Sequence, residues 1–292
     1  MSRQDYFPKA AFLLILGLAF ALAANAQQDA VSVDPPQSQS SPQQAGADVP
    51  PAPVPEKLLT DFVEVGGSYR QLSNDFGDWS GGYARGVWAT GNNTWNGEIN
   101  GQHEFGDGGV YLAAGDTYNF NSDWYASLTL GSSVGGFFWP RFRADAFVNR
   151  KWSARKQFIT TLGYGYYASK DVHRDTSVFI GTTYYFQKPW ILEDGIRFNV
   201  SNPGVVFSPA GFVALTEGQN KHHYVTVNAG FGEEAYQLVG PTTVLNRFES
   251  QNLTITWRQW TGKNWGFDFV ADYYHSPFYE RGGGSFGFFK EF

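Results

Sequence analysis

Strict alternation of apolar residues with small or polar ones is the feature that most limits how this chain can fold. The pattern begins near Leu58 and continues to Phe292, in runs of about ten to fourteen residues that end at Gly, Asn, Asp or Pro. Successive side chains of a β-strand point to opposite faces, so each run predicts a strand with one apolar face. The clearest run places on one face Trp265, Phe267, Phe269, Ala271 and Tyr273. We predict an all-β fold of about 14 strands, within a range of roughly 12 to 16.

Composition narrows the class of protein. A net charge of −6 argues against a generic nucleic-acid-binding protein, which needs a concentrated basic face. The absence of cysteine excludes disulfides, thiolate metal sites and a cysteine nucleophile. Charged residues make up 16% of the chain and aromatic residues 18%, whereas about a quarter of a soluble domain is charged. These values, with the alternation, favour a transmembrane antiparallel up-and-down β-barrel.

The first 56 residues differ from the rest. Arg3 and Lys9 precede an apolar run at residues 10–22, and Ala24-Asn25-Ala26 has the small-residue pattern of a cleavage site. We therefore predict a cleaved signal peptide at residues 1–26, which directs export. Residues 27–56 are rich in Pro, Gln and Ser and are predicted to form a disordered tether. The barrel is expected to occupy residues 57–292.

Tryptophan placement supports the membrane assignment. Seven tryptophans lie near predicted tight turns and share the apolar face of their strands: Trp88, Trp95, Trp124, Trp152, Trp190, Trp257 and Trp265. An indole suits the boundary between lipid and water, so we expect these side chains to form a girdle at one membrane interface. The chain also ends on Phe292, a terminal residue typical of barrels delivered to the outer-membrane assembly machinery, and it is our candidate assembly signal.

The predicted connections fall into two sets. Tight turns, such as those at Gly91-Asn92 and Gly262-Lys263, are expected at the periplasmic rim, and longer loops at the extracellular rim. The longest predicted loop is residues 232–248. In the ninth strand, Asp194 falls on an otherwise apolar face, which suggests a bulge at Asp194-Gly195.

Charged residues collect on the predicted inward face. The pore-lining candidates are Arg85, Arg141, Arg143, Asp145, Glu193, Arg197, Arg258, Asp268 and Asp272, and Glu64, Glu98 and Glu104 share their parity. Two interpretations remain open. The residues either line a charged pore or form ion pairs that fill a narrow barrel, because buried charges must be paired.

Evidence for catalysis or metal binding is weak, and we predict no catalytic residue, metal or cofactor. The best hydrolase candidate is His275-Ser276 near Asp272, at the extracellular rim. A weak calcium site is conceivable at Asn74, Asp75 and Asp78. His222 and His223 are expected on opposite faces, and His173 in a solvated charge cluster.

The body of the chain resembles the YaiO family of outer-membrane β-barrels over residues 62–292. The resemblance rests on VEVGGSY at residues 63–69, WSGGY at 79–83, WPRFRA at 139–144, LGYGY at 162–166 and NAGFGE at 228–233. It implies a barrel in a Gram-negative outer membrane, beside exopolysaccharide-export machinery in related cases. None of these motifs is catalytic.

The sequence thus favours a passage role, for small solutes or for exopolysaccharide export. The expected partners are outer-membrane lipid, lipopolysaccharide, the barrel-assembly machinery and polysaccharide-export components, and no nucleic acid. One alternative is a structural or adhesin barrel that acts through the loop at residues 232–248. Others are a hydrolase at the rim and a soluble secreted lectin.

Overall fold

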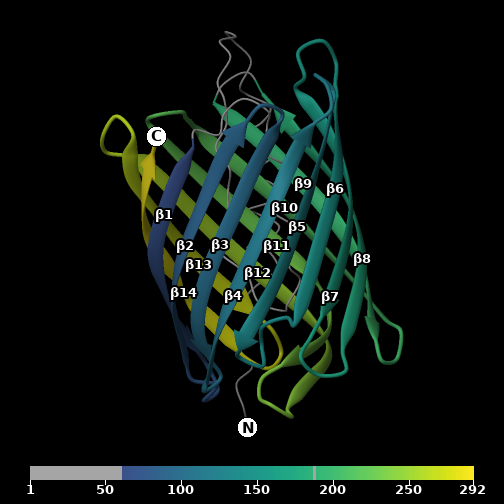
Figure 1. The fold of residues 1–292 in the computed structure, drawn as a ribbon. Helices are drawn as coiled ribbons and strands as arrows, with labels where there is room; N and C mark the ends of the chain where they lie inside the picture. Colours follow the sequence, from purple (N-terminus) through teal and green to yellow (C-terminus); the bar gives the residue numbers. More distant parts are fainter. Residues whose placement is uncertain (1–60, 187–188) are drawn as a thin grey trace, which may run out of the picture.

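The computed structural model describes residues 61–186 and 189–292, which form a single closed barrel (Figure 1). The predicted signal peptide and tether lie outside the described residues. Its strands are β1 (Phe62–Leu72), β2 (Asp78–Thr90), β3 (Asn93–Glu104), β4 (Asp107–Asn119), β5 (Trp124–Gly135), β6 (Phe142–Trp152), β7 (Phe158–Ala168), β8 (Arg174–Tyr185), β9 (Trp190–Asn202), β10 (Val206–Gln219), β11 (His223–Leu238), β12 (Val244–Trp260), β13 (Trp265–His275) and β14 (Glu280–Glu291). No helix in this part of the chain is long and apolar enough to cross a membrane.

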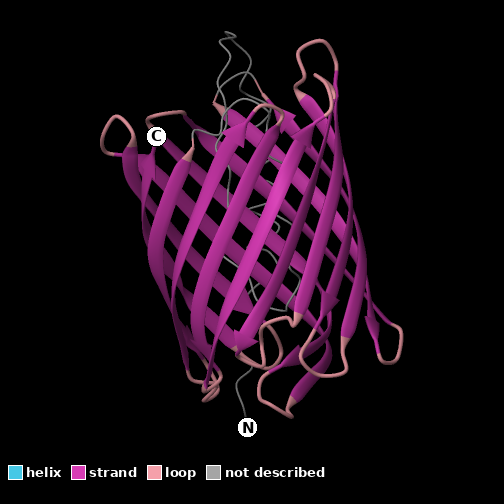
Figure 2. Cartoon of the chain, viewed as in Figure 1, coloured by secondary structure: helices cyan, strands magenta, loops and turns pink. Residues whose placement is uncertain are grey.

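Each strand pairs antiparallel with its neighbours in sequence, and β1 pairs with β14 to close the barrel (Figure 2). The closing register runs from Phe62 opposite Glu291 to Leu72 opposite Arg281. Closure pairs every strand on both sides, which is the condition for a sheet to span lipid. The prediction of an antiparallel barrel of about 14 strands is confirmed.

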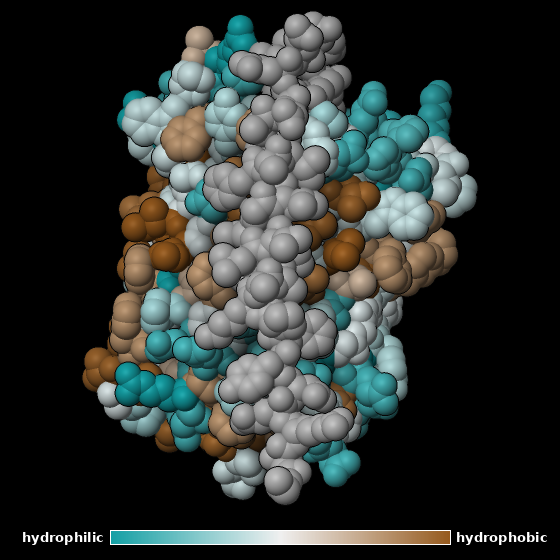
Figure 3. Space-filling view, turned by 180° about the vertical axis from the view of Figure 1, so that it is seen from behind, coloured by the Kyte–Doolittle hydropathy of each residue, from teal (hydrophilic) through white to brown (hydrophobic). Residues whose placement is uncertain are grey.

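Burial alternates along the strands as the sequence pattern requires. In β13 the exposed Trp265, Phe269 and Tyr273 alternate with the buried Asp268 and Tyr274. Figure 3 shows hydrophobic side chains gathered on the outer wall, on both sides of the grey atoms. The outer face is therefore apolar, and the polar residues of the strands turn into the lumen.

The barrel has two rims, which we name by their position relative to the ends of the chain. At the terminal rim β1 begins and β14 ends, and the distal rim lies at the opposite ends of the strands. The two sets of connections differ less in length than predicted. The predicted long loop is wrong, because β11 and β12 stay paired to Leu238 opposite Val244 and leave only residues 239–243 as the turn.

This paired extension, residues 234–248, is named the distal hairpin. Its ladder is interrupted at Ala235 and Arg247, and Arg247 adopts a positive φ of 47°. The turn falls at Gly240-Pro241, two residues typical of turns. The acidic and turn-forming residues around this segment made it resemble a loop, whereas cross-strand pairing keeps it extended.

The predicted bulge in β9 is also wrong. Asp194 pairs in regular register with Thr182 on β8 and Val213 on β10. Its exposed side chain accepts a hydrogen bond of 2.8 Å from the Thr182 hydroxyl. A cross-strand partner on the outer face thus accommodates the carboxylate without a break in the strand.

Inside the barrel, aromatic rings lie over glycines of neighbouring strands. A Cβ added at Gly195 would lie 2.4 Å from the Phe179 ring and 2.8 Å from that of Phe212. Phe147, Phe179 and Phe212 form one buried cluster with Ala214. The glycine lets these rings lie flat on the wall, so this sector of the lumen is filled with aromatic side chains.

The lumen and its distal mouth

The first charged network of the lumen lies near the terminal rim and centres on Glu64, which is fully buried. Arg85 Nη2 donates to Glu64 Oε1 at 2.7 Å, and the Tyr83 hydroxyl donates to the same oxygen at 2.9 Å. Arg258 lies 3.7 Å from the other oxygen, Oε2, and donates at 2.8 Å to Asp268. Four charges from β1, β2, β12 and β13 thus compensate one another across the lumen wall.

An aromatic collar surrounds this network at the terminal rim. Phe62, Tyr224, Trp260 and Phe289 form a buried cluster with Val87. The guanidinium carbon of Arg258 lies 3.7 Å from the ring centroid of Phe289, within cation–π range. The collar thus packs against Arg258 at the terminal end of the lumen.

A second network lies near the distal rim. Arg70 Nε donates to both carboxylate oxygens of Asp272 at 2.9 Å, and Arg281 lies 3.7 Å from the same carboxylate. The Arg281 guanidinium also lies 4.6 Å from the Trp79 ring centroid. Glu104 is fully buried near this network, and its two carboxylate oxygens make no hydrogen bond with the residues that the structure describes.

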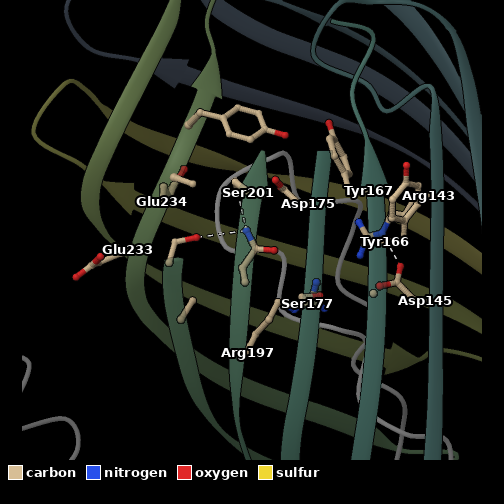
Figure 4. Close-up of a pocket in the computed structure, with 16 residues that line it drawn as sticks. Arg143, Asp145, Tyr166, Tyr167, Asp175, Ser177, Arg197, Ser201, Glu233 and Glu234 are labelled. Carbon is tan, nitrogen blue, oxygen red and sulfur yellow. Dashed lines mark hydrogen bonds and ion pairs between the residues drawn. The ribbon is translucent and has the colours of Figure 1, made fainter. Parts of the chain in front are cut away.

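A third group occupies the opposite wall, beneath the distal hairpin (Figure 4). Arg143 donates to Asp145 on β6, and Arg197 of β9 lies close to the same carboxylate across Gly165. These residues line a cavity of about 80 Å³ whose walls come from β6 to β11. In the part of the chain that the structure describes, open space therefore remains between the charged groups of this wall.

The structure places most of the predicted pore-lining residues in the lumen. Arg141 is the exception, because it precedes β6, is exposed at the distal rim and bonds through its backbone N–H to Ala168. Sequence reasoning missed Arg70 and Arg281. Strand parity counted from Glu64 would have found Arg70. The sequence pattern predicts the last strand at residues 283–292, so it leaves out Arg281, which the structure places in β14.

Aromatic residues of several distal loops meet at the mouth. Trp79, Tyr274 and Tyr279 form a buried cluster with Leu72, and Phe76, Phe105 and Leu245 pack against it. A second cluster contains Trp139, whose ring stacks on Tyr111 at 4.9 Å. The Phe105 and Phe137 rings, 6.3 Å apart, join the two clusters.

The distal hairpin contacts the mouth on two sides. On one side the Tyr236 ring stacks on His173 with centroids 4.0 Å apart. On the other side Gln237 donates to the Tyr279 hydroxyl, and Tyr274 donates at 2.7 Å to Glu234. The hairpin thus links the β7–β8 loop to the β13–β14 loop at the distal mouth.

His173 therefore supports the hairpin, which corrects its predicted place in a solvated cluster. Its Nδ1 lies 2.6 Å from Asp171 in the β7–β8 loop. Burial raises the pKa of Asp171, but hydrogen bonds from Ser169 and His173 outweigh burial and hold that pKa below its ordinary value. An ionised Asp171 orients the imidazole on which Tyr236 stacks.

The predicted hydrolase group does not come together. His275 is exposed on the outer face and lies 3.3 Å from Glu280, whereas Asp272 faces the lumen. The buried Ser276 hydroxyl bonds instead to the backbone oxygen of Tyr279.

The other candidate ligand groups also differ from expectation. His222 and His223 are not on opposite faces, because their Nδ1 atoms lie 2.5 Å apart. Asn74 donates to the backbone oxygen of Phe278, and Asp78 accepts from the Tyr69 hydroxyl. Among the described residues, no three His, Cys, Asp or Glu side chains could hold a metal ion.

The predicted girdle residues all lie in the first or last few residues of their strands at the terminal rim. Trp88, Trp95, Trp124, Trp152, Trp257 and Trp265 are exposed and Trp190 is half-buried, while Trp79, Trp139 and Trp260 are buried. Phe292 follows β14 and is exposed, and its backbone N–H bonds to Asp61. A ring of indoles thus surrounds the terminal rim.

Comparison with known families decides the family of this barrel. The YaiO membrane beta barrel domain matches residues 60–237, which is more than half of the chain. The chain belongs to this family. The resemblance in the sequence motifs is thereby confirmed, although β12–β14 lie beyond the matched residues. The protein is a barrel of the outer membrane. No curated protein matches the sequence.

Solved structures show the same fold at low sequence identity. A "CymD monoaromatic hydrocarbon channel" has a TM-score of 0.55 at 7% identity over 80% of this chain and 88% of that one. The Pseudomonas putida toluene transporter TodX has a TM-score of 0.53 at 10% identity, covering 80% and 90%. The COG4313 outer membrane channel from Pseudomonas putida F1 has a TM-score of 0.51 at 8% identity, covering 84% and 100%.

Proposed function

We propose that this YaiO barrel is a passage for polar solutes across the outer membrane, closed at its extracellular mouth by the distal hairpin. The observation that carries the proposal is the lumen itself. Paired guanidinium and carboxylate groups line it at both ends, and a cavity remains open beneath the hairpin.

Stability alone does not explain these charges. Replacing a buried ion pair with well-packed apolar residues is often neutral or stabilising. A barrel that served only as a scaffold would therefore be no less stable with well-packed apolar residues in place of Glu64, Arg258 and Asp272. Rings of charged side chains are instead how pores select what passes.

The solute is polar in this proposal. The hydrocarbon channel and the toluene transporter are named for apolar solutes, but the charged lumen of this barrel is a poor path for such molecules. Small polar solutes and exopolysaccharide both suit it. In the cell, the signal peptide would deliver the chain to the periplasm, the tether would lie on the periplasmic side, and the seven indoles would contact lipid near the terminal rim.

Partners follow from the same arrangement. Outer-membrane lipid and lipopolysaccharide would contact the apolar wall, the barrel-assembly machinery would receive the strand that ends at Phe292, and polysaccharide-export components would meet the terminal rim. The adhesin alternative is less favoured, because Tyr236 and Gln237 of the distal hairpin are buried against the barrel.

The ion selectivity of the barrel tests whether solutes pass through its lumen. We expect single-channel currents from the refolded barrel in a planar bilayer, restricted to preparations whose folding is shown by a heat-dependent gel shift. Replacing the lumen cations with R143Q and R197Q should move the reversal potential in a salt gradient toward that of cations, because two positive charges leave the path.

The R141Q variant is the matched control. It removes the same charge from the exposed rim, so its reversal potential should equal that of the wild type. Equal shifts in all variants would place the current outside this lumen. Silence from inserted barrels, with and without the distal hairpin, would overturn the passage.

A further inference from the structure

The cavity beneath the distal hairpin has the character of a binding site. Its wall is continuous over β6 to β10, and residues 233–236 of β11 cover it (Figure 4). A buried water needs roughly 10–15 Å³ of such space, so about 80 Å³ holds about six waters. Displacing that number of waters makes room for one sugar ring.

Hydrogen-bond donors and acceptors are mixed on this wall. Arg143 and Arg197 supply donors, and Asp145 and Asp175 supply acceptors. Between them lie groups that can do both: Ser177, Asn199, Ser201 and Ser208. Asn199 Nδ2 lies 3.0 Å from Ser201 Oγ and 3.3 Å from Ser208 Oγ, which holds the three side chains in one cluster. Closely spaced donors and acceptors match a ligand with several adjacent hydroxyls.

The wall and the distal hairpin meet through a polar pair. Asp175 of β8 has Tyr236 of the hairpin as a hydrogen-bond partner, together with Ser201 and Asn199 of β9. Buried polar groups in folded proteins are nearly always paired, and a ligand hydroxyl in the cavity can take a place in this network without leaving a group unpaired.

The charge of the lining restricts the ligand further. Two guanidinium groups face three carboxylates, Asp145, Asp175 and Glu234, whereas the exposed Glu233 side chain points away from the cavity (Figure 4). The acidic excess disfavours an anion and tolerates a neutral or amino-bearing ligand. We propose that this cavity binds one sugar unit that carries no carboxylate. The inference rests on the proposed passage and names the class of solute that pauses in it.

The cavity also contacts the distal hairpin. Tyr236 lines the cavity on the side of the distal hairpin and also stacks on His173. A sugar bound in the cavity would therefore touch the hairpin. Passage and binding would then be coupled through Tyr236.

Calorimetric titration of the refolded barrel in detergent tests the site with three probes: glucose, glucosamine and glucuronate. We expect saturable binding of glucose and glucosamine, and at least tenfold weaker binding of glucuronate. The D175N variant keeps the shape but removes the charged acceptor, and should weaken glucose binding about tenfold. S177A, a smaller change, should weaken it by a few-fold.

The matched control is D194N, which removes a carboxylate from the outer face of neighbouring β9 and should leave binding unchanged. Binding of none of the three sugars, or equal binding of glucuronate, would overturn the site. So would unchanged affinity in both D175N and S177A. A barrel that conducts ions but binds no sugar rejects this site alone, whereas a folded, silent barrel rejects the passage.

Discussion

Shortening the distal hairpin is expected to open the pore. Glu234 and Phe248 are cross-strand partners, so residues 235–247 can be replaced by a two-residue Asn-Gly turn that suits such a pair. The change removes Tyr236 and Gln237, which link the hairpin to loops on opposite sides of the mouth. We expect the open probability in planar bilayers to rise at least tenfold, with the heat-dependent gel shift retained.

The control shortens a different distal connection. Residues 202–205, the last residue of β9 and the turn to β10, are replaced by the same Asn-Gly turn between the paired Ser201 and Val206. This connection makes none of the contacts that hold the hairpin, so its open probability should match the wild type. If the shortened hairpin left the current unchanged in folded, inserted barrels, it would not be the barrier.

The second large effect concerns stability. The E64A variant is expected to lower the free energy of unfolding by about 3–5 kcal/mol, the cost of breaking a buried pair from one side. Glu64 is the carboxylate that Arg85 and Tyr83 contact and that Arg258 approaches. Its loss leaves Asp268, with Glu98 opposite Arg85 on β3, to compensate two guanidinium groups. Urea unfolding from lipid vesicles, followed by tryptophan fluorescence, measures the difference.

Two further variants show whether the effect comes from the buried network. E64Q keeps an oxygen acceptor at the same place and should lose less stability than E64A. D194A removes an exposed carboxylate from the outer face and should be neutral or stabilising. A loss below about 1 kcal/mol in E64A would mean that this network does not hold the barrel together.

The barrel could be predicted from sequence because its rule is local. In β13, the apolar stripe from Trp265 to Tyr273 indicates which face of the strand meets lipid. The same alternation with a period of two identifies the lipid-facing side of the other strands. The same parity placed Arg85, Arg197 and Asp268 in the lumen. It failed at Arg141, one residue before the start of β6, where strand pairing has not begun and parity has no meaning.

The mouth could not be predicted, because it depends on contacts between loops far apart in the chain. Nothing local in Phe105 or Tyr279 shows that their rings approach to 6.3 Å. Turn residues and acidic residues made the distal hairpin resemble a loop, and only its cross-strand register shows that it is paired. His173 likewise gained its role from Tyr236, a partner more than sixty residues later in the sequence.

Reversible locking of the hairpin tests the central claim most directly. The chain has no cysteine, so Q237C with Y279C places the only two thiols where the hairpin meets the β13–β14 loop. A cleavable thiol cross-linker should close the channel, and reduction should restore a current larger than that of the wild type, because the native contact is gone. The cysteine-free wild type should not respond to the reagent. An unchanged current through fully cross-linked barrels would contradict a mouth closed by this hairpin.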